Sequence, residues 1–390
     1  MARDSFTDFI LAHADDDTAR LLFACGRYPG IDLRKACTVI EARRKAKAKL
    51  PTWFAEPQIL YPSSLALEQC SSEATALYKQ RFVPEGASVA DITGGLGVDS
   101  SFFARKAASV TYIERNPALC EAALHNFEAL GLGNVKVVCA ETCAANLPEG
   151  RYDLIFADPA RRSKTSSRVY DIADCEPDIL QLKDALLEIS EALLVKISPM
   201  ADITRTLRLF PEATELHIVS SDGEVKELLV YCRKEQPLGE KAPVFAEGLR
   251  LTLEEEAACL PHYAPALGKY IFVPAKGLLK AGAFKLTAAR FGLSQLAPGT
   301  HLYTADSPVE FFPGRTYELL EAAAWSKSAA AELVKRYPAA ELTAVNFPLS
   351  TDDLRKRLRL KDGGTAHIFA TTFKNSKFLL TCKRFSDNQI

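Results

Sequence analysis

Short apolar runs, most of them followed by a helical pattern, recur through the middle of the chain. The runs predict strands at residues 88–92, 109–113, 135–139, 153–157, 192–197, 215–219 and 225–231. Strands that alternate with helices are typical of a doubly wound α/β fold with a parallel sheet. The last two runs flank Ser221-Asp222-Gly223, an Asp-Gly hairpin signal, so the sheet is expected to end in an antiparallel pair. A nicotinamide-type dinucleotide fold ends its sheet with parallel strands instead.

Residues 1–83 show helical periodicity, with Phe6, Phe9 and Ile10 on one apolar face. This region also carries a dense basic run, made of Arg43, Arg44, Lys45, Lys47 and Lys49. Cations so close together form either a solvated helix face or an RNA-contacting one, and the pattern leaves both interpretations open. The segment 61–82 predicts an amphipathic helix that runs straight into the first strand and packs against the next domain as a lid.

From residue 236 the pattern becomes a mixture of strands and helices, which predicts α+β modules. Strands are expected at 270–273, 301–304, 315–321, 341–346, 365–372 and 377–382. Helices are expected at 275–291, with interruptions at Gly277 and Gly282, and at 327–336 and 351–360. A second basic cluster consists of Arg355, Lys356, Arg357, Arg359 and Lys361. It is either a substrate-binding surface or a solvated helix end whose cations interact well with the helix dipole.

Composition narrows the class of protein. The 390 residues are 48% hydrophobic and carry a net charge of −1, so any basic surface for nucleic acid must be local. The 10 cysteines form no C-x-x-C pair, which favours buried free thiols over a disulfide framework or a metal site. No apolar run approaches a membrane span, and the first 25 residues lack a cleavable apolar core. We therefore expect a cytoplasmic protein with no metal and no membrane partner; the sequence predicts no oligomeric state.

Candidate chemistry begins at residues 89–99, which read V-A-D-I-T-G-G-L-G-V-D. Three glycines, Gly94, Gly95 and Gly97, follow the first strand and precede a helical pattern. Glycine permits positive φ and lets a ligand approach the backbone, so the turn can form a shelf for a flat ligand. Asp91, near the end of the strand, would repel a pyrophosphate but attract an ammonium group.

Acidic residues also follow the next three strands: Glu114, Glu141 and Asp158. Any one of them alone would be an ordinary solvated or capping acid. Because the carboxyl ends of parallel strands meet at one edge of the sheet, the acids are expected to share one ligand site.

This order of motifs resembles the class I S-adenosylmethionine-dependent methyltransferases over roughly residues 60–235. The terminal hairpin also resembles that family. The segments Ser64-Leu-Ala-Leu-Glu-Gln, Leu279-Lys-Ala-Gly-Ala-Phe-Lys and Asn346-Phe-Pro-Leu-Ser are similar to a bacterial methyltransferase group with a THUMP-like C-terminal region.

The resemblance implies a fold and a domain plan. The fold is α/β, with a Rossmann-like class I methyltransferase sheet that is parallel except for an antiparallel terminal hairpin. The implied domains are a helical region at 1–83, the methyltransferase domain at 84–235, a small ferredoxin-like α+β module at 236–312 and a THUMP-like α+β module at 313–390.

The resemblance also implies S-adenosyl-L-methionine as cofactor. Asp91 would then lie near the methionine ammonium, Glu114 would accept the ribose hydroxyls, and Glu141 would accept from the adenine amino group. The full set of expected cofactor-binding residues is Asp91, Thr93, Gly94, Gly95, Gly97, Glu114, Arg115, Glu141 and Asp158.

The block Asp158-Pro-Ala-Arg-Arg bears on catalysis. Amine-methylating nucleic-acid enzymes use a D/N-P-P-aromatic turn that grips a flipped base. Ala160 and Arg161 replace the second proline and the aromatic residue, which argues against amine methylation of adenine or cytosine. Asp158, Pro159 and Arg161 are the expected catalytic residues. Arg161 would stack on a base or grip a phosphate, or else form a salt bridge within the loop.

A covalent pyrimidine mechanism needs a cysteine nucleophile near strand four or five, and no cysteine lies there. Cys175 lies well beyond the D-P turn. Direct methyl transfer is therefore expected, with Asp158 as acceptor or base. Lys196, at the end of strand five, is either a second group in the active site or an edge lysine outside it.

Three functions follow. The first is an RNA methyltransferase for rRNA or tRNA, gripped by the basic patches at both ends of the chain. Its expected substrate-binding residues are Arg161, Arg162, Lys196, Arg355 and Arg357. The second is a protein or small-molecule methyltransferase. The third is a non-catalytic RNA-binding protein with a retained fold, which the intact acids argue against.

Overall fold

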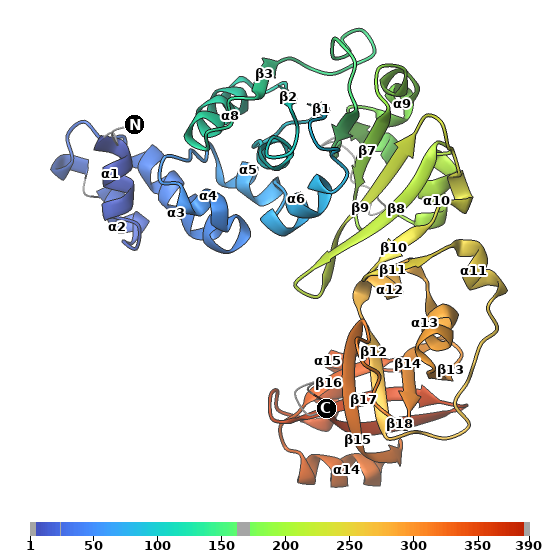
Figure 1. Cartoon of the computed structure of the whole chain (residues 1–390). Coiled ribbons are helices and arrows are strands. Elements are labelled where there is room, and N and C mark those ends of the chain that lie inside the picture. Colours follow the sequence, from blue (N-terminus) through green and yellow to red (C-terminus); the bar gives the residue numbers. More distant parts are fainter. Residues whose placement is uncertain (1–4, 24, 162–171, 386–390) are drawn as a thin grey trace. The chain divides into compact units, whose positions relative to one another are not determined.

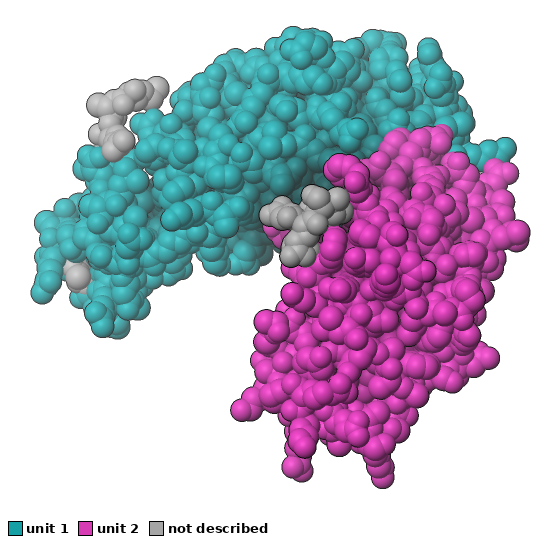
Figure 2. Space-filling view, turned by 60° about the horizontal axis from the view of Figure 1, so that its bottom comes forward, with its two compact units in different colours: residues 1–221, 226–242 teal, residues 222–225, 243–390 magenta. Residues whose placement is uncertain are grey.

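The structure is a computed structural model that describes residues 5–23, 25–161 and 172–385. The chain forms two compact units (Figure 2). Unit 1 contains residues 1–221 and 226–242, and unit 2 contains residues 222–225 and 243–390.

The strands of unit 1 lie in the order β3-β2-β1-β4-β7-β9-β8 (Figure 1). Their bounds are β1 Ser88–Asp91, β2 Ser109–Glu114, β3 Val135–Cys139, β4 Leu154–Ala157, β7 Ala192–Ile197, β8 Ala213–Ser221 and β9 Glu224–Arg233. The pairs β1–β2, β2–β3, β1–β4 and β4–β7 are parallel, and β9 runs antiparallel to β7. The expected α/β fold, with a parallel sheet that ends in an antiparallel hairpin, is confirmed.

Local sequence signals start the helices between these strands. The helices are α7 Val98–Phe103, α8 Pro117–Ala129, α9 Ile179–Glu188 and α10 Ile203–Leu209. The side chains of Asn116, Asp178 and Asp202 accept hydrogen bonds from the backbone N–H groups of α8, α9 and α10. Such caps satisfy helix N–H groups that have no partner within the helix.

Within the described residues, six α-helices precede the first strand (Figure 1). They are α1 Ser5–Ala12, α2 Thr18–Phe23, α3 Leu33–Lys49, α4 Pro51–Ala55, α5 Ser64–Gln69 and α6 Glu73–Gln80. Their apolar side chains form one cluster with Leu96, Val98 and Phe102, which belong to the glycine turn and to α7. The buried indole of Trp53 donates to Ser101 Oγ at 3.2 Å. The helical region is therefore an integral part of unit 1.

Most cations of the basic run on α3 are used inside the protein. The buried guanidinium of Arg43 donates to the backbone oxygens of Phe54, Glu56 and Pro57. Further contacts join Arg44 to the backbone oxygens of Ala14 and Asp16, Lys45 to Glu68, and Lys49 to the backbone oxygens of Leu67 and Glu68. The run therefore mainly holds the helices together, and the interpretation as an RNA-contacting face loses its support.

Unit 2 is built on a second sheet of seven strands, in the order β13-β14-β12-β15-β18-β17-β16. Their bounds are β12 Tyr270–Pro274, β13 Ser294–Ala297, β14 Thr300–Ala305, β15 Gly314–Ala324, β16 Glu341–Val345, β17 Ala366–Phe373 and β18 Ser376–Arg384. β16 pairs parallel with β17, and the other neighbouring strands of this sheet pair antiparallel. Because β12 pairs with β15, the two expected C-terminal modules share one continuous sheet.

Unit 2 also contains a short strand hairpin and several helices. They are the hairpin strands β10 Val244–Ala246 and β11 Leu249–Leu251, and the helices α11 Leu253–Ala258, α12 Lys276–Ala281, α13 Phe284–Phe291, α14 Lys327–Arg336 and α15 Thr351–Leu358. Of the two interruptions expected in the helix at 275–291, the one at Gly282 is present, because Gly282 adopts φ 69°, a left-handed conformation that ends a helix. Gly277 lies inside α12 and does not interrupt it.

Candidate functional site

A cavity of about 720 Å³ lies in unit 1, at the edge of the sheet where the parallel strands end. Its walls come from the segments that follow β1, β2, β3, β4 and β7, and from the end of α5. Ligands of open α/β sheets bind at this edge, so the cavity is the candidate site.

The glycine turn supplies one wall. A side chain at Gly94 would overlap the buried ring of Tyr112, whose hydroxyl donates to the backbone oxygen of Gly95 at 2.6 Å. Gly97 adopts φ 87°, and a Cβ there would lie 2.9 Å from Phe127 Cζ. Both positions therefore require glycine, because the ring below and the backbone angle leave no room for another residue.

Asp91 lies behind the turn and does not line the cavity. Its carboxylate accepts from Thr93 N at 3.1 Å and from Ser100 Oγ at 2.6 Å. Burial raises the pKa of Asp91 to about 7, and the carboxylates of Asp99 and Asp158 act in the same direction. The carboxylate thus organises the turn, and any effect on a ligand in the cavity acts through the electric field.

Glu114 is the last residue of β2 and lines the cavity. One carboxylate oxygen accepts from Gly95 N at 2.9 Å, and the other accepts from Asn116 N at 2.8 Å. Two backbone N–H groups therefore fix the carboxylate in place and leave further lone pairs for a ligand.

Two salt bridges of Arg115 form part of the cavity wall. The guanidinium of Arg115 lies 3.2 Å from a carboxylate oxygen of Glu141 and 3.2 Å from one of Glu176. These contacts, with Glu176 first, raise the pKa of Arg115. Glu176 was not predicted, because it reaches the cavity through β6 Cys175–Glu176, a two-residue strand that pairs with β5 Ala160–Arg161.

Asp158 and Lys196 meet at the cavity. Lys196 Nζ donates to Asp158 Oδ2 at 2.6 Å, and Asp158 N donates to Thr93 Oγ1 at 2.6 Å. Although Lys196 is largely buried, the carboxylates of Asp158 and Glu227 raise its pKa above the ordinary lysine value. Lys196 therefore lines the cavity as a charged group, and its role as a second group in the active site stays a prediction.

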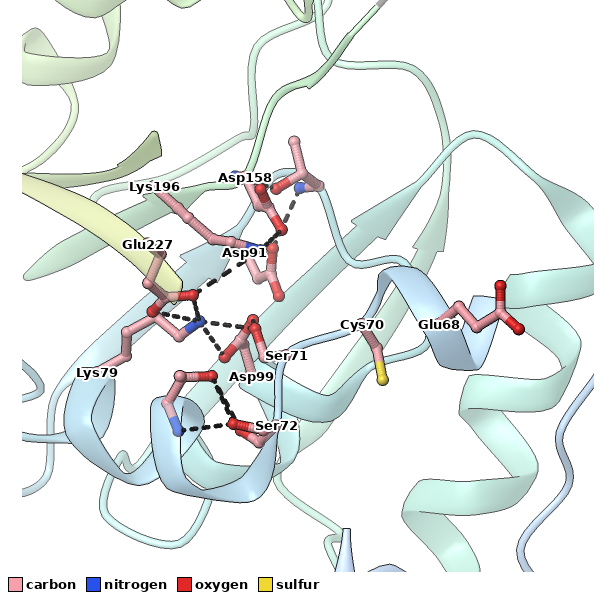
Figure 3. A network of polar contacts seen from close by, with 12 residues as sticks. Glu68, Cys70, Ser71, Ser72, Lys79, Asp91, Asp99, Asp158, Lys196 and Glu227 are labelled. Carbon is pink, nitrogen blue, oxygen red and sulfur yellow. Dashed lines mark hydrogen bonds and ion pairs between the residues drawn. The ribbon is translucent and has the colours of Figure 1, made fainter. Parts of the chain in front are cut away.

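A buried network of charged groups continues from this pair (Figure 3). Lys79, on α6, is fully buried and lies 2.9 Å from Asp99 Oδ1 and 3.1 Å from Glu227 Oε1. It also donates to Ser71 Oγ at 2.7 Å, and Ser71 Oγ donates to Asp99 Oδ2 at 2.7 Å. Asp99 and Ser71 line the cavity, whereas Lys79 and Glu227 lie behind it.

The structure brings most of the expected residues together. Those that line the cavity are Thr93, Gly94, Gly95, Glu114, Arg115, Glu141, Asp158 and Lys196. Gly97 and the buried Pro159 do not line it, Arg161 contributes its backbone to β5, and Arg162 lies outside the described residues. Arg355 and Arg357 belong to α15 of unit 2.

Several lining residues were missed by the sequence analysis, among them Ser71, Asp99 and Gln181. Asp99 could have been found, because it follows the last glycine of the turn by two positions. Cys70 also lines the cavity, and burial raises the pKa of its thiol to about 11, which makes it a poor nucleophile.

Metal sites and membrane-spanning helices are two further features that the described residues could contain. Within residues 5–23, 25–161 and 172–385, no cluster of three or more His, Cys, Asp or Glu side chains is arranged to hold a metal ion. Over the same ranges, no helix is both long and apolar enough to cross a membrane.

Comparison with known proteins adds to this geometry. Two family models match the C-terminal part of the chain: a ferredoxin-like domain over residues 270–313 and a THUMP domain-like family over residues 314–384. A search of curated proteins found no match.

Solved structures give a longer match. A crystal structure from Porphyromonas gingivalis W83, described as a "putative methyltransferase", is 36% identical over 99% of this chain and 100% of that chain, with a TM-score of 0.87. An rRNA methylase from Streptococcus thermophilus is 15% identical over 42% of this chain and 94% of its own, with a TM-score of 0.31, which supports no conclusion about this chain. The identity to the first structure, over essentially all of both chains, shows that this chain belongs to the same family, the class I methyltransferases with a THUMP-like C-terminal domain.

Proposed function

We propose that the protein is an S-adenosyl-L-methionine-dependent methyltransferase that acts on structured RNA, rRNA or tRNA, by direct methyl transfer. The observation that carries the cofactor assignment is Glu114, whose carboxylate is fixed at the cavity by two backbone N–H groups. A carboxylate held in this way is a ready acceptor for the two hydroxyls of a ribose.

The lining of the cavity fits such a cofactor. Its described residues include six carboxylates, those of Asp99, Glu114, Glu141, Asp158, Glu176 and Asp178, against the two cations Arg115 and Lys196. This excess of negative charge suits the sulfonium and ammonium groups of the methyl donor. The volume of about 720 Å³ is within the range of small-molecule sites.

The chain's own residues would position the acceptor. Bound cofactor would supply an electrophilic methyl group, so the protein has to orient a nucleophile and remove charge. Lys196 donates to one carboxylate oxygen of Asp158 at 2.6 Å and holds it in place, so we infer that Asp158 accepts a hydrogen bond from the target group. Pro159 fixes the turn, and Arg161 and Arg162 follow it as contacts to RNA.

RNA is proposed because of the C-terminal unit. The match to a THUMP domain-like family covers residues 314–384, and the exposed cations Lys356, Arg357, Arg359 and Lys361 lie within it. Modules rich in exposed cations bind the phosphate backbone through charge. The position of this unit in the chain is consistent with a substrate-holding role.

Calorimetry of the full chain tests the cofactor. Glu114→Ala should weaken binding of S-adenosyl-L-methionine by more than about tenfold, because two charge-assisted hydrogen bonds are lost. Glu128→Ala removes an exposed glutamate of α8 outside the cavity and should leave binding unchanged. Equal affinities of wild type and Glu114→Ala for S-adenosyl-L-methionine would contradict the assignment of Glu114 as the ribose acceptor.

The substrate is tested by mapping modified nucleotides in rRNA and tRNA by mass spectrometry. A strain that lacks the gene should lose one methyl mark, and wild-type protein should restore it while Asp158→Ala does not. An RNA methylation profile that does not change on deletion would exclude RNA as the substrate.

A further inference from the structure

A buried network of charged side chains adjoins the cavity, and its positive and negative charges do not cancel. It joins Lys79 and Lys196 to the carboxylates of Asp99, Asp158 and Glu227. Every lysine has a carboxylate within 3.1 Å, yet the carboxylates outnumber the lysines by one. The network therefore has a formal charge of −1 in the interior of the protein.

Glu227 is the residue responsible for this excess. Its side chain is 3% exposed, does not line the cavity, and lies 3.1 Å from Lys79 and 3.9 Å from Lys196. Both lysines already have another partner, Asp99 for Lys79 and Asp158 for Lys196. Glu227 is thus not needed to neutralise either cation, and it places an additional negative charge behind the cavity.

Hydrogen bonds and ion pairs together hold the network: Lys79 Nζ donates to Glu227 Oε2 at 3.3 Å, and Lys196 Nζ donates to Asp158 Oδ2 at 2.6 Å. Among the described residues, the other oxygens, Asp99 Oδ1 and Glu227 Oε1, have no partner with hydrogen-bond geometry, although each lies within ion-pair distance of Lys79. In a protein interior, with an effective dielectric constant of about 20, a charge so placed acts on neighbouring groups several times more strongly than in water. The excess charge therefore acts on a ligand in the cavity, because Asp99, Asp158 and Lys196 line its wall.

We propose that the negative charge of this network makes the cavity bind the methyl donor, which carries a positive sulfonium, more tightly than the product, which lacks it. Glu227 is then a specificity-determining residue, because it supplies the excess negative charge. The inference rests on the proposed cofactor. S-adenosylmethionine and S-adenosylhomocysteine share the adenine, the ribose and the amino acid end. On transfer the bond from sulfur to the methyl carbon breaks, its electron pair stays on sulfur, and the acceptor's lone pair forms the new bond. The product therefore lacks the positive charge that the network holds, and it is released more easily.

The test is the ratio of the affinities for donor and product, measured by calorimetry on the full chain. Contacts to the shared parts cancel in this ratio. Glu227→Gln keeps each lysine paired but brings the network to neutrality, and should lower the preference for the donor by about fivefold to tenfold. Glu227→Asp keeps the charge and should retain most of the preference.

A matched control is Glu212→Gln. Glu212 is a partly buried carboxylate paired with Lys183, and neither lines the cavity. This variant should leave the ratio as it is in the wild type. A ratio that changes equally in Glu227→Gln and Glu212→Gln, or in neither, would overturn the inference.

Two outcomes separate this inference from the proposed cofactor. If wild-type protein binds neither compound, the cofactor assignment fails. If it binds both but prefers the neutral product by tenfold or more, the cofactor stands and the discrimination is wrong; this comparison needs no variant and so does not depend on how well Glu227→Gln folds.

Discussion

Tyr112 determines what the glycine turn can contain. Its buried ring occupies the space that a side chain at Gly94 would need. Gly94→Ala should therefore lower the free energy of unfolding by about 1–3 kcal/mol, because an inserted methyl group in a packed region forces neighbours to move. Gly133→Ala, with no atom within 4 Å of the added Cβ, is the control and should be nearly neutral. Urea unfolding of both variants measures the difference, and equal stabilities would show that the ring can shift at no cost.

The ionisation of Asp91 should appear in the pH dependence of stability. Burial raises its pKa in the folded protein to about 7, from about 3.9 in an unfolded chain. The proton is thus held more tightly in the folded state, so this stabilisation is complete below about pH 4 and is lost as the pH rises to about 7. Asp91→Asn is neutral throughout. Its melting temperature relative to wild type should therefore increase between pH 5 and pH 8, and a difference independent of pH would contradict the buried, protonated form.

At the scale of elements, helix α3 shows why a charge pattern does not define a surface. Arg43 donates to three backbone oxygens that connect α3 to the segment after α4. Arg43→Ala should cost about 2–4 kcal/mol of unfolding free energy, since buried acceptors lose their donors. Lys47 is exposed and should tolerate Ala within about 0.5 kcal/mol. Thermal unfolding of the two variants measures this difference in stability. A large loss of RNA affinity in Lys47→Ala would instead support the interpretation of α3 as an RNA-contacting face.

The elements themselves were largely predictable. The runs that became β1, β4 and β7 are largely apolar on both faces, as parallel strands covered by helices must be. Glu114 at the end of β2 and Asp158 directly after β4 mark the shared edge. Lys79 could not be predicted as buried. Its helix is amphipathic, and its burial depends on Glu227, 148 residues away. Glu176 was missed for a similar reason, since a short strand pair brings it to the cavity.

At the scale of the whole molecule, binding of RNA is predicted to depend on salt through unit 2. Lys356 and Arg357 are exposed on α15, whereas Arg355 is held by Asp362 at 2.9 Å and by the backbone oxygen of Ala340. Replacing Lys356 and Arg357 by Ala should reduce the slope of log affinity against log salt by about 2, one for each lost phosphate contact. Filter binding of structured RNA over a salt series measures the slope.

A pair of exposed cations on α14 provides the comparison. Replacing Lys327 and Lys335 by Ala removes the same charge from unit 2 and should leave the slope unchanged. If both double variants lower the slope equally, net charge rather than a defined surface on α15 governs binding.

The ion pairs of Lys79 also have a consequence for folding during translation. The helices before β1 and the glycine turn share a core, and all of these residues are translated within the first 103 positions. They can pack while the rest of the chain is still being made, but Lys79 then has only Asp99 as an acidic partner, because Glu227 lies on β9 and is translated much later. Glu227 is therefore the last member of the charged network to be synthesised. We expect ribosome-bound chains ending before residue 227 to protect the first helices from protease yet to bind no methyl donor.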